Sequence, residues 1–321
     1  MRTEKISKPN RKVIAVVGPT ASGKTSLAAA IAKKLDTEVI SADSRQVFKE
    51  FDIAVAKPSE KEMQGVKHHL IGIIDPSEEF SVANFADEAK RVMEKLFSEN
   101  KIPVVAGGTG LYFRILLENF EMPRVAPNKE LREQLHNIAA TQGVDVLYKM
   151  LLELDPKLAS GMHKNNTVKI IRALEVCKTL NMPMSEAQKV KQEPEYDVLW
   201  LGLGHLNGED RQFLYNRTDR RVDLMIEKGL EQEARELFEK YGKIPSLLRT
   251  IGYQEFEEYF EGKLTYDEAV EKIKQNTRRY AKRQLTWFRR NSAIHWLDIE
   301  KNSFDELVSE SLKIIDSKMT L

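Results

Sequence analysis

The sequence predicts an α/β fold in which a doubly wound parallel sheet is interrupted along the chain by a helical insertion. Three apolar runs in the first third have the composition of buried strands and alternate with helical segments: 13–17, 38–42 and 101–106. Such alternation predicts a parallel sheet with helices on both faces. Helical periodicity without a strand pattern then precedes the strand-like run 198–203. We expect a core at 1–120 and 197–321, a mostly helical insertion domain at 121–196, and a helical C-terminal region.

The composition is that of a folded protein without a membrane segment. The chain has 321 residues, with 50 Lys and Arg against 49 Asp and Glu. It contains no run of about 18 apolar residues, and the polar, basic residues 1–12 do not resemble a secretory signal. The lone Cys177 cannot build a disulfide framework or a cysteine-based zinc site, and its apolar helical neighbours predict a core position. We expect a cytoplasmic monomer that contacts no membrane.

A phosphate-binding loop (P-loop) is predicted at Gly18–Thr25, between the first strand-like run and a helical segment. Its glycines allow backbone angles that direct several N–H groups at an anion near the positive end of a helix dipole. Lys24 adds a point charge, and the Thr25 hydroxyl can bind a magnesium ion that is shared with the phosphates. We therefore predict a diphosphate or triphosphate site, with Thr25 as metal ligand, formed by Gly18, Thr20, Ala21, Ser22, Gly23, Lys24 and Thr25.

Two further strand ends carry polar residues that belong in the same pocket. The second strand-like run ends at Asp43, and the third ends at the glycine-rich segment that contains Thr109. Because ligands bind outside the carboxyl ends of parallel strands, Lys24, Asp43 and Thr109 should share one crevice. Asp43 could accept a proton or hold a substrate hydroxyl, and the Thr109 hydroxyl could position the reacting group.

The segment around 68–76 leaves two interpretations open. Asp75 follows an apolar run, as an acid that holds magnesium would, but Pro76 suits an acid at the entrance of a loop equally well. His68 and His69 are adjacent in a strand-like segment, so their side chains point to opposite faces and do not easily bind one ion. Structural or hydrogen-bonding roles are expected for both histidines.

A helical segment near the C-terminus, residues 278–290, carries six basic residues and no acid. On a helix, one side collects Arg279, Lys282, Arg283, Thr286, Arg289 and Arg290. Another side collects Ala281, Leu285 and Phe288. The basic side could simply be a solvated face, but solvated helices generally mix charges of both signs. We therefore predict a surface that tracks phosphates, with Tyr280 and Trp287 available for base stacking.

Five motifs, in this order, closely resemble those of the bacterial tRNA dimethylallyltransferase family: Gly18–Thr25, Ser41–Gln46, Gly107–Tyr112, Arg249–Tyr253 and Lys282–Arg289. The resemblance covers about residues 12–297. It implies transfer of a dimethylallyl group from dimethylallyl diphosphate to the N6 amine of the adenosine 3′-adjacent to the anticodon in tRNA, with release of diphosphate. It also implies Mg²⁺ as cofactor and the tRNA anticodon stem-loop as partner.

The resemblance further implies roles for individual residues. Lys24, Asp43 and Thr109 would be catalytic, with Asp43 as the base, together with one arginine, Arg217 or Arg221. The insertion would act as a clamp on tRNA through Arg132 and Arg172, although Arg172 could equally cap a helix. The tRNA-binding set would be Asp43, Ser44, Arg45, Gln46, Thr109, Arg132, Arg172, Arg249, Gly252, Tyr253, Lys282, Arg283, Gln284, Thr286, Trp287 and Arg289.

Three other functions share part of this pattern. An ATP-dependent small-molecule kinase would use the same P-loop, but it gives no reason for the basic helical segment or for the segment Arg249–Tyr253. An RNA-binding ATPase switch without enzymatic activity is a third alternative. Prenyl transfer to a free adenine nucleotide would keep the chemistry and change the acceptor, but a mononucleotide needs neither the basic helical segment nor the large insertion.

Overall fold

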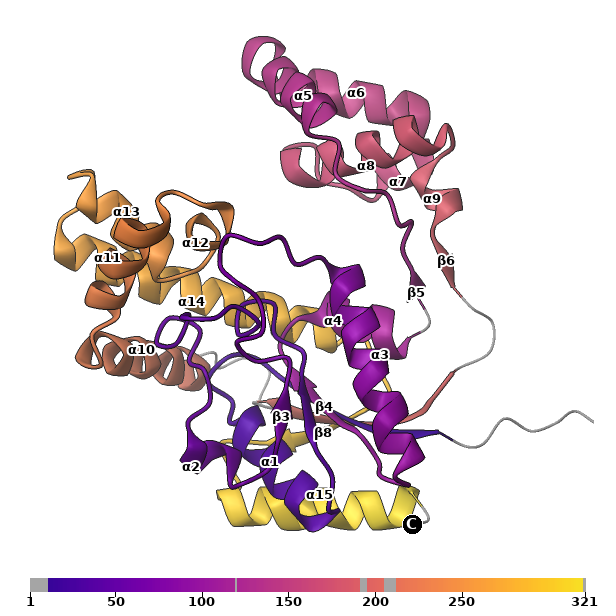
Figure 1. Ribbon diagram of the computed structural model, residues 1–321, viewed down its shortest axis with the longest axis vertical. Coiled ribbons are helices and arrows are strands. Elements are labelled where there is room, and N and C mark those ends of the chain that lie inside the picture. Colours follow the sequence, from indigo (N-terminus) through magenta and orange to yellow (C-terminus); the bar gives the residue numbers. More distant parts are fainter. Residues whose placement is uncertain (1–10, 119, 191–194, 205–211, 320–321) are drawn as a thin grey trace, which may run out of the picture. The chain divides into compact units, whose positions relative to one another are not determined.

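The computed structural model describes residues 11–118, 120–190, 195–204 and 212–319. The chain forms two compact units: one comprises residues 1–117 and 195–321, and the other comprises residues 118–194 (Figure 1). The sequence predicts a helix at 210–228, and its first two residues, Asp210 and Arg211, lie outside the described residues.

The first unit is built on a six-stranded parallel sheet with the order β3-β2-β4-β1-β7-β8. The strands are β1 (Lys12–Val17), β2 (Val39–Ser41), β3 (His68–His69), β4 (Val104–Gly107), β7 (Asp197–Gly204) and β8 (Ile294–Asp298). The predicted fold class is confirmed, and the strand-like runs in the first third and at 198–203 form central strands. The edge strand β8 was not predicted, because its five residues include polar ones that interrupt the apolar pattern.

Helices cover both faces of this sheet, and alternate residues of β1 show why its apolar run is continuous. Val13, Ala15 and Val17 join a core cluster with α3 (Val82–Ser98) and α4 (Gly110–Leu117). Ile14 and Val16 join a second cluster with α1 (Lys24–Lys34) and α15 (Phe304–Lys318). A strand that is buried on both faces cannot alternate apolar and polar residues.

The helical C-terminal region packs around a third core cluster. The helices that contribute to this cluster are α10 (Gln212–Glu227), α11 (Leu230–Tyr241), α12 (Pro245–Leu248), α13 (Tyr253–Phe260) and α14 (Tyr266–Phe288). The short helix α2 (Glu60–Met63) lies earlier in the chain and contributes no residue to it. Helix α14 begins with a capping box between Thr265 and Glu268 and passes from this cluster to the sheet, where Phe288 is buried. From the sequence alone, the helix from about Thr265 to Asn291 is expected to be the last helix of the chain. This prediction is wrong, because β8 and the amphipathic α15 follow α14 (Figure 1).

The second unit contains α5 (Lys129–Gln142), α6 (Val144–Leu154), α7 (Pro156–Ser160), α8 (Thr167–Leu180) and α9 (Met184–Ala187). Leu135, Leu147, Leu151 and Leu174 form its core together with Cys177, whose predicted core position is confirmed. A short antiparallel pair, β5 (Phe120–Glu121) and β6 (Lys189–Val190), joins its two ends. The sequence predicts no strand in this unit, since two-residue strands are too short to show a period of two.

Within the part of the chain that the structure describes, no helix is long and apolar enough to cross a membrane.

Candidate active site

The predicted P-loop connects β1 to α1 and has the backbone that its glycines were expected to allow. Gly18 has φ of 152° and Gly23 has φ of 93° at the N-cap of α1. A Cβ atom on Gly18 would lie 2.5 Å from the Leu203 carbonyl oxygen, so no larger residue fits there. The Lys24 Nζ donates to the Pro19 carbonyl across the loop at 2.8 Å.

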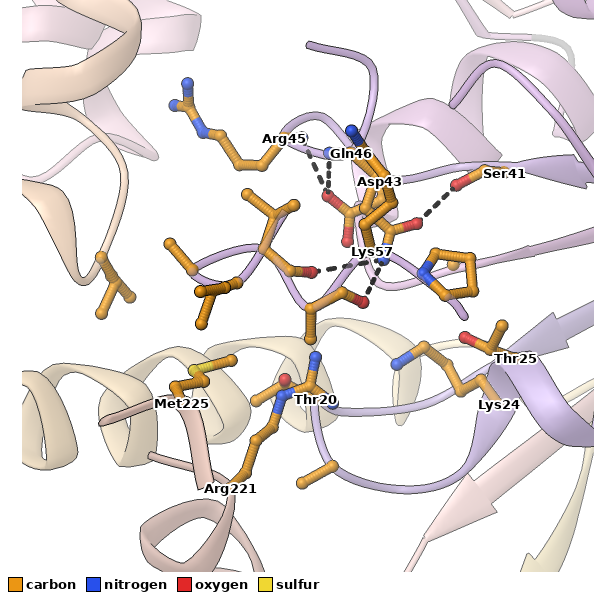
Figure 2. A pocket seen from close by; sticks show the side chains of 18 of the residues that line it. Thr20, Lys24, Thr25, Ser41, Asp43, Arg45, Gln46, Lys57, Arg221 and Met225 are labelled. Carbon is orange, nitrogen blue, oxygen red and sulfur yellow. Dashed lines mark hydrogen bonds between the residues drawn. The ribbon is translucent and has the colours of Figure 1, made fainter. Parts of the chain in front are cut away.

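The loop opens into a pocket of about 720 Å³, and Figure 2 shows Lys24 and Arg221 along one wall and Asp43 along the facing wall. Thr20, Ala21, Gly23, Lys24 and Thr25 of the predicted phosphate site line it, whereas Gly18 and Ser22 do not. The pocket thus joins the ends of β1 and β2, as the parallel sheet predicted.

Two cations of this pocket, Lys24 and Arg221, form no ion pair with a carboxylate of the described residues. Burial, aided by repulsion from Arg221, lowers the pKa of Lys24 to about 8, although Asp43 opposes the shift. Arg221 has a buried Nε without a hydrogen-bond partner among the described residues, and burial lowers the pKa of its guanidinium. Arg217 is exposed, does not line the pocket and donates from Nε to the Ala21 carbonyl at 2.8 Å. Of the two candidate arginines, Arg221 is the one that reaches the pocket.

Asp43 is held by its own loop. Its Oδ1 accepts from the backbone N–H groups of Arg45 at 2.8 Å and Gln46 at 3.3 Å (Figure 2). Its Oδ2 makes no hydrogen bond within the described part of the chain.

Thr109 does not line the pocket, contrary to expectation. Its Oγ1 accepts from the Ser44 N–H at 3.1 Å and so supports the Asp43 loop from behind.

Gln46 lines the pocket, but its amide is already engaged. Its Nε2 donates to the carbonyls of Val55 at 3.3 Å and Ala56 at 3.2 Å, and its Oε1 accepts from the Ser41 hydroxyl at 3.1 Å. The side chain therefore fixes the segment 52–57, all of which lines the pocket. This role of the segment 52–57 could not be predicted, because its residues form no motif that would place it near Asp43.

The segment 52–57 is also anchored from α11. The Glu233 carboxylate accepts from the N–H groups of residues 52, 53 and 54 at 3.2, 2.8 and 3.0 Å, and from the Tyr253 hydroxyl at 2.7 Å. Tyr253 is fully buried, and Gly252 is buried beside it. The expectation that Tyr253 binds tRNA is therefore corrected: its hydroxyl supports the pocket through Glu233, a residue that the sequence analysis missed.

Helix α14 divides its residues as the helical periodicity predicted. Arg279, Lys282, Arg283, Thr286, Arg289 and Arg290 are exposed, whereas Ala281 and Phe288 are buried. Arg283 and the exposed Arg249 line the pocket. Two expected tRNA contacts face inward instead. Gln284 is buried, and Trp287 packs so closely on Gly110 that a Cβ atom there would lie 2.2 Å from the indole.

In the segment 68–76, Asp75, His68 and His69 have structural or hydrogen-bonding roles. Asp75 does not line the pocket, and its Oδ1 accepts from the Ser77 N–H at 2.9 Å, as an acid at the entrance of a loop does. His69 pairs with Glu38. His68 lines the pocket and contacts the Val66 carbonyl through Nδ1 at 2.9 Å. Burial lowers the pKa of His68, which favours its neutral form.

In the second unit, Arg132 and Arg172 both bind Glu175, whose side chain is fully buried. The Arg132 Nε to Glu175 Oε1 distance is 2.9 Å, and the Arg172 Nη1 to Glu175 Oε2 distance is 2.5 Å. Arg172 also donates to the Val125 carbonyl at 3.0 Å. Both arginines thus have a structural role, while their side chains remain 36% and 30% exposed.

A parallel sheet whose first strand feeds a phosphate loop, with an acid at the end of the next strand, defines a P-loop α/β enzyme that handles a phosphate ester. The sequence model of the family described as IPP transferase matches residues 46–291. The chain belongs to this family of prenyl-transferring enzymes, and the resemblance inferred from the five motifs is confirmed.

Known proteins of similar sequence and structure agree. The chain is 43% identical over 304 residues to the tRNA dimethylallyltransferase of Acetivibrio thermocellus, covering 94% of this chain and 96% of that protein. It resembles the solved tRNA isopentenylpyrophosphate transferase of Bacillus halodurans with a TM-score of 0.72 and 39% identity, covering 96% and 97% of the two chains. A eukaryotic dimethylallyltransferase acting on tRNA gives a TM-score of 0.77 at 29% identity, covering 96% of this chain and 80% of that one.

Proposed function

We propose that the protein transfers the dimethylallyl group of dimethylallyl diphosphate to the N6 amine of the adenosine 3′-adjacent to the anticodon in tRNA and releases diphosphate. The names of its relatives support the tRNA acceptor and the prenyl donor. The observation that carries the proposal is that Lys24 and Arg221 line one pocket with Asp43. Two half-buried cations can thus bind an anion beside an acid that can receive a proton.

The cations act on the leaving group. As the bond between the allylic carbon and the diphosphate oxygen breaks, the electron pair leaves with the diphosphate, and Lys24 and Arg221 stabilise the added negative charge. Thr20, Ala21 and Gly23 place the P-loop backbone at the same end of the pocket. We propose Arg221 for this contact, with Arg217 supporting the loop through the Ala21 carbonyl.

Asp43 acts on the acceptor. An adenine amine is a weak nucleophile, and it must lose a proton as its nitrogen bonds to the allylic carbon. The Asp43 Oδ2, which its own loop leaves without a hydrogen bond, is the proposed proton acceptor. Thr109 holds this arrangement through the Ser44 N–H. The adenosine has to leave its stack to enter the pocket.

Magnesium fits the pocket as a cofactor held mainly by its substrate. No group of three or more His, Cys, Asp or Glu residues that could hold a metal occurs in the described part of the chain. Mg²⁺ often takes few protein ligands and several phosphate and water oxygens, and the Thr25 side chain lines the pocket next to Lys24. When bound, Mg²⁺ would neutralise charge on the departing diphosphate.

The tRNA is proposed to bind the exposed basic surface of α14 and its surroundings. The proposed contacts are the exposed Arg249, Lys282, Arg283, Thr286 and Arg289 and the half-buried Arg45, of which Arg45, Arg249 and Arg283 line the pocket. The partly exposed Arg132 and Arg172 of the insertion are the proposed clamp residues. The protein is proposed to act as a cytoplasmic monomer.

One labelling experiment tests the function. The protein is incubated with Mg²⁺, radiolabelled dimethylallyl diphosphate and either unmodified tRNA or AMP, and a parallel reaction contains γ-labelled ATP. Label in tRNA, lost when the target adenosine is replaced by guanosine, is the expected result. Label in AMP would show that the acceptor is a free adenine nucleotide and not tRNA. Phosphate transfer from ATP would show that the protein is a kinase and not a prenyltransferase.

A further inference from the structure

One buried side chain connects the P-loop to the loop that carries Thr109, and Thr109 in turn supports the Asp43 loop. Gln284 lies on the inward face of α14 and is 5% exposed. Its Oε1 accepts from the Thr20 N–H of the P-loop at 2.7 Å, and its Nε2 donates to the Gly108 carbonyl at 3.1 Å. Thr20 belongs to the proposed diphosphate site, and Gly108 precedes Thr109, which supports the Asp43 loop.

The contact between α14 and this second loop leaves no room for side chains on the loop. A Cβ atom on Gly108 would lie 2.1 Å from the Gln284 Nε2 and 3.2 Å from the Gln284 Cδ, and the nearest atom of another residue, the Gly18 carbonyl oxygen, would be 3.7 Å away. One turn further along α14, a Cβ atom on Gly110 would lie 2.2 Å from the Trp287 ring. Thr109 is thus held between two points at which α14 rests on the loop backbone.

The two hydrogen bonds of Gln284 fix the orientation of the Thr20 N–H and the Gly108 carbonyl. A P-loop binds an anion through N–H groups that must point inward before the ligand arrives. Because the Thr20 N–H is bound to Gln284, the first half of the P-loop is fixed to α14, and Arg217 fixes the next residue through the Ala21 carbonyl. The amide of Gln284 suits this task because it offers both an acceptor and a donor.

We infer that Gln284 is a positioning residue that sets the separation of the P-loop from the loop carrying Thr109, and thereby the approach of the acceptor amine to the donor carbon. The inference rests on the proposed function and replaces the expected contact of Gln284 with tRNA. A displacement of about 1 Å between reacting groups can reduce a rate by about 100-fold, so loss of the bridge should reduce the rate more than tRNA affinity.

The test uses the full-length protein with Gln284→Met, which keeps length and volume but removes both hydrogen bonds. Gln275→Met, at an exposed position of the same helix, is the matched control. For Gln284→Met we expect a single-turnover rate about 10- to 100-fold lower with saturating substrates, and a tRNA Kd within about twofold of the wild-type value. A tRNA Kd raised about tenfold with an unchanged rate would overturn the inference, and so would no change in either quantity.

Binding of inorganic diphosphate, measured by calorimetry, needs no acceptor and separates this inference from the proposed function. Gln284→Met should weaken this binding about 3- to 10-fold, because the Thr20 N–H loses its partner. If the wild-type protein transfers no label to tRNA, the proposed function fails, while unchanged diphosphate affinity in Gln284→Met would still refute the role of Gln284 in the P-loop.

A double-mutant cycle covers the case in which Gln284→Met folds poorly. Gly108→Ala should slow the wild-type protein about tenfold or more, because the new methyl group displaces the Gln284 amide. In a Gln284→Ala background the same substitution should cost little further rate, since the nearest remaining atom is at ordinary contact distance. Equal effects of Gly108→Ala in both backgrounds would overturn the inference.

Discussion

Half-buried cations of the pocket and of the insertion have opposite surroundings. In the pocket, Lys24 and Arg221 form no ion pair with a carboxylate among the described residues, and burial lowers the pKa of both. In the insertion, Arg132 and Arg172 share the carboxylate of Glu175. Burial alone would raise the pKa of Glu175, but hydrogen bonds from both arginines and the Asn128 N–H lower it.

The difference separates charges that bind a ligand from charges that hold the fold. An uncompensated buried cation costs stability until an anion arrives, and this cost becomes part of the affinity and specificity for that anion. A cation with a buried partner stabilises its own unit, because removing it would leave the partner's charge unpaired. The surroundings of Arg132 and Arg172 therefore explain their positions without tRNA, and their role as a clamp remains a proposal.

The largest effect is expected from Asp43, the acid that faces the pocket cations. Asp43→Asn keeps the shape and the Oδ1 hydrogen bonds but cannot accept a proton. The single-turnover rate of label transfer to tRNA should fall about 10²- to 10⁴-fold, the range for loss of a general base, with little loss of donor affinity. Turnover within threefold of wild type would remove Asp43 from the role of base.

Replacement of a pocket cation should reduce activity and spare stability. Arg221→Met should lower the transfer rate about 10²- to 10³-fold, as loss of one charge-stabilising group does, while the free energy of unfolding stays the same or rises by about 1 kcal/mol. Kinetics and urea denaturation on the same preparation measure both quantities. Clear destabilisation with a near-normal transfer rate would show that Arg221 stabilises the fold and does not act on the leaving group.

The matching substitution in the insertion, Arg172→Met, should reduce stability more than activity. Arg172→Met leaves the buried Glu175 with Arg132 as its only cation, beside the Asn128 N–H, and the free energy of unfolding should fall by about 1–3 kcal/mol. This is below the usual cost of breaking a fully buried pair, because the Arg172 side chain is 30% exposed. Scanning calorimetry measures the loss, and Glu175→Gln combined with Arg172→Met should restore part of it.

A smaller effect is expected from pH. Because the pKa of Lys24 lies at about 8 in the ligand-free protein, donor binding should weaken as the pH rises above 8, by at most about tenfold per pH unit. The same shift destabilises the ligand-free fold below about pH 8, and this cost fades as the pH approaches 10.5, the ordinary value of the side chain. Calorimetric titration with dimethylallyl diphosphate between pH 6.5 and 9.5 measures the trend, and Lys24→Met should abolish it.

Several features of the site could be predicted because local residues specify them. The P-loop follows from glycines with positive φ between a strand and a helix, and its meeting with Asp43 follows from the parallel arrangement of β1 and β2. The two-sided character of α14 follows from helical periodicity. The same periodicity could not show that Gln284 and Trp287 face inward. A glutamine or a tryptophan side chain can lie at the surface of a helix, or it can pack against the backbone of a neighbouring loop.

By itself, the sequence determined the fold class, the P-loop, the basic surface of α14 and the family, because each depends on residues that are close together in the chain. Only the tertiary structure decided which arginine reaches the pocket, that Glu233 and Tyr253 hold the segment 52–57, and that Gln284 bridges two loops. These contacts join residues about 20 to 260 positions apart, and whether a polar side chain meets solvent, substrate or a backbone amide is set by packing.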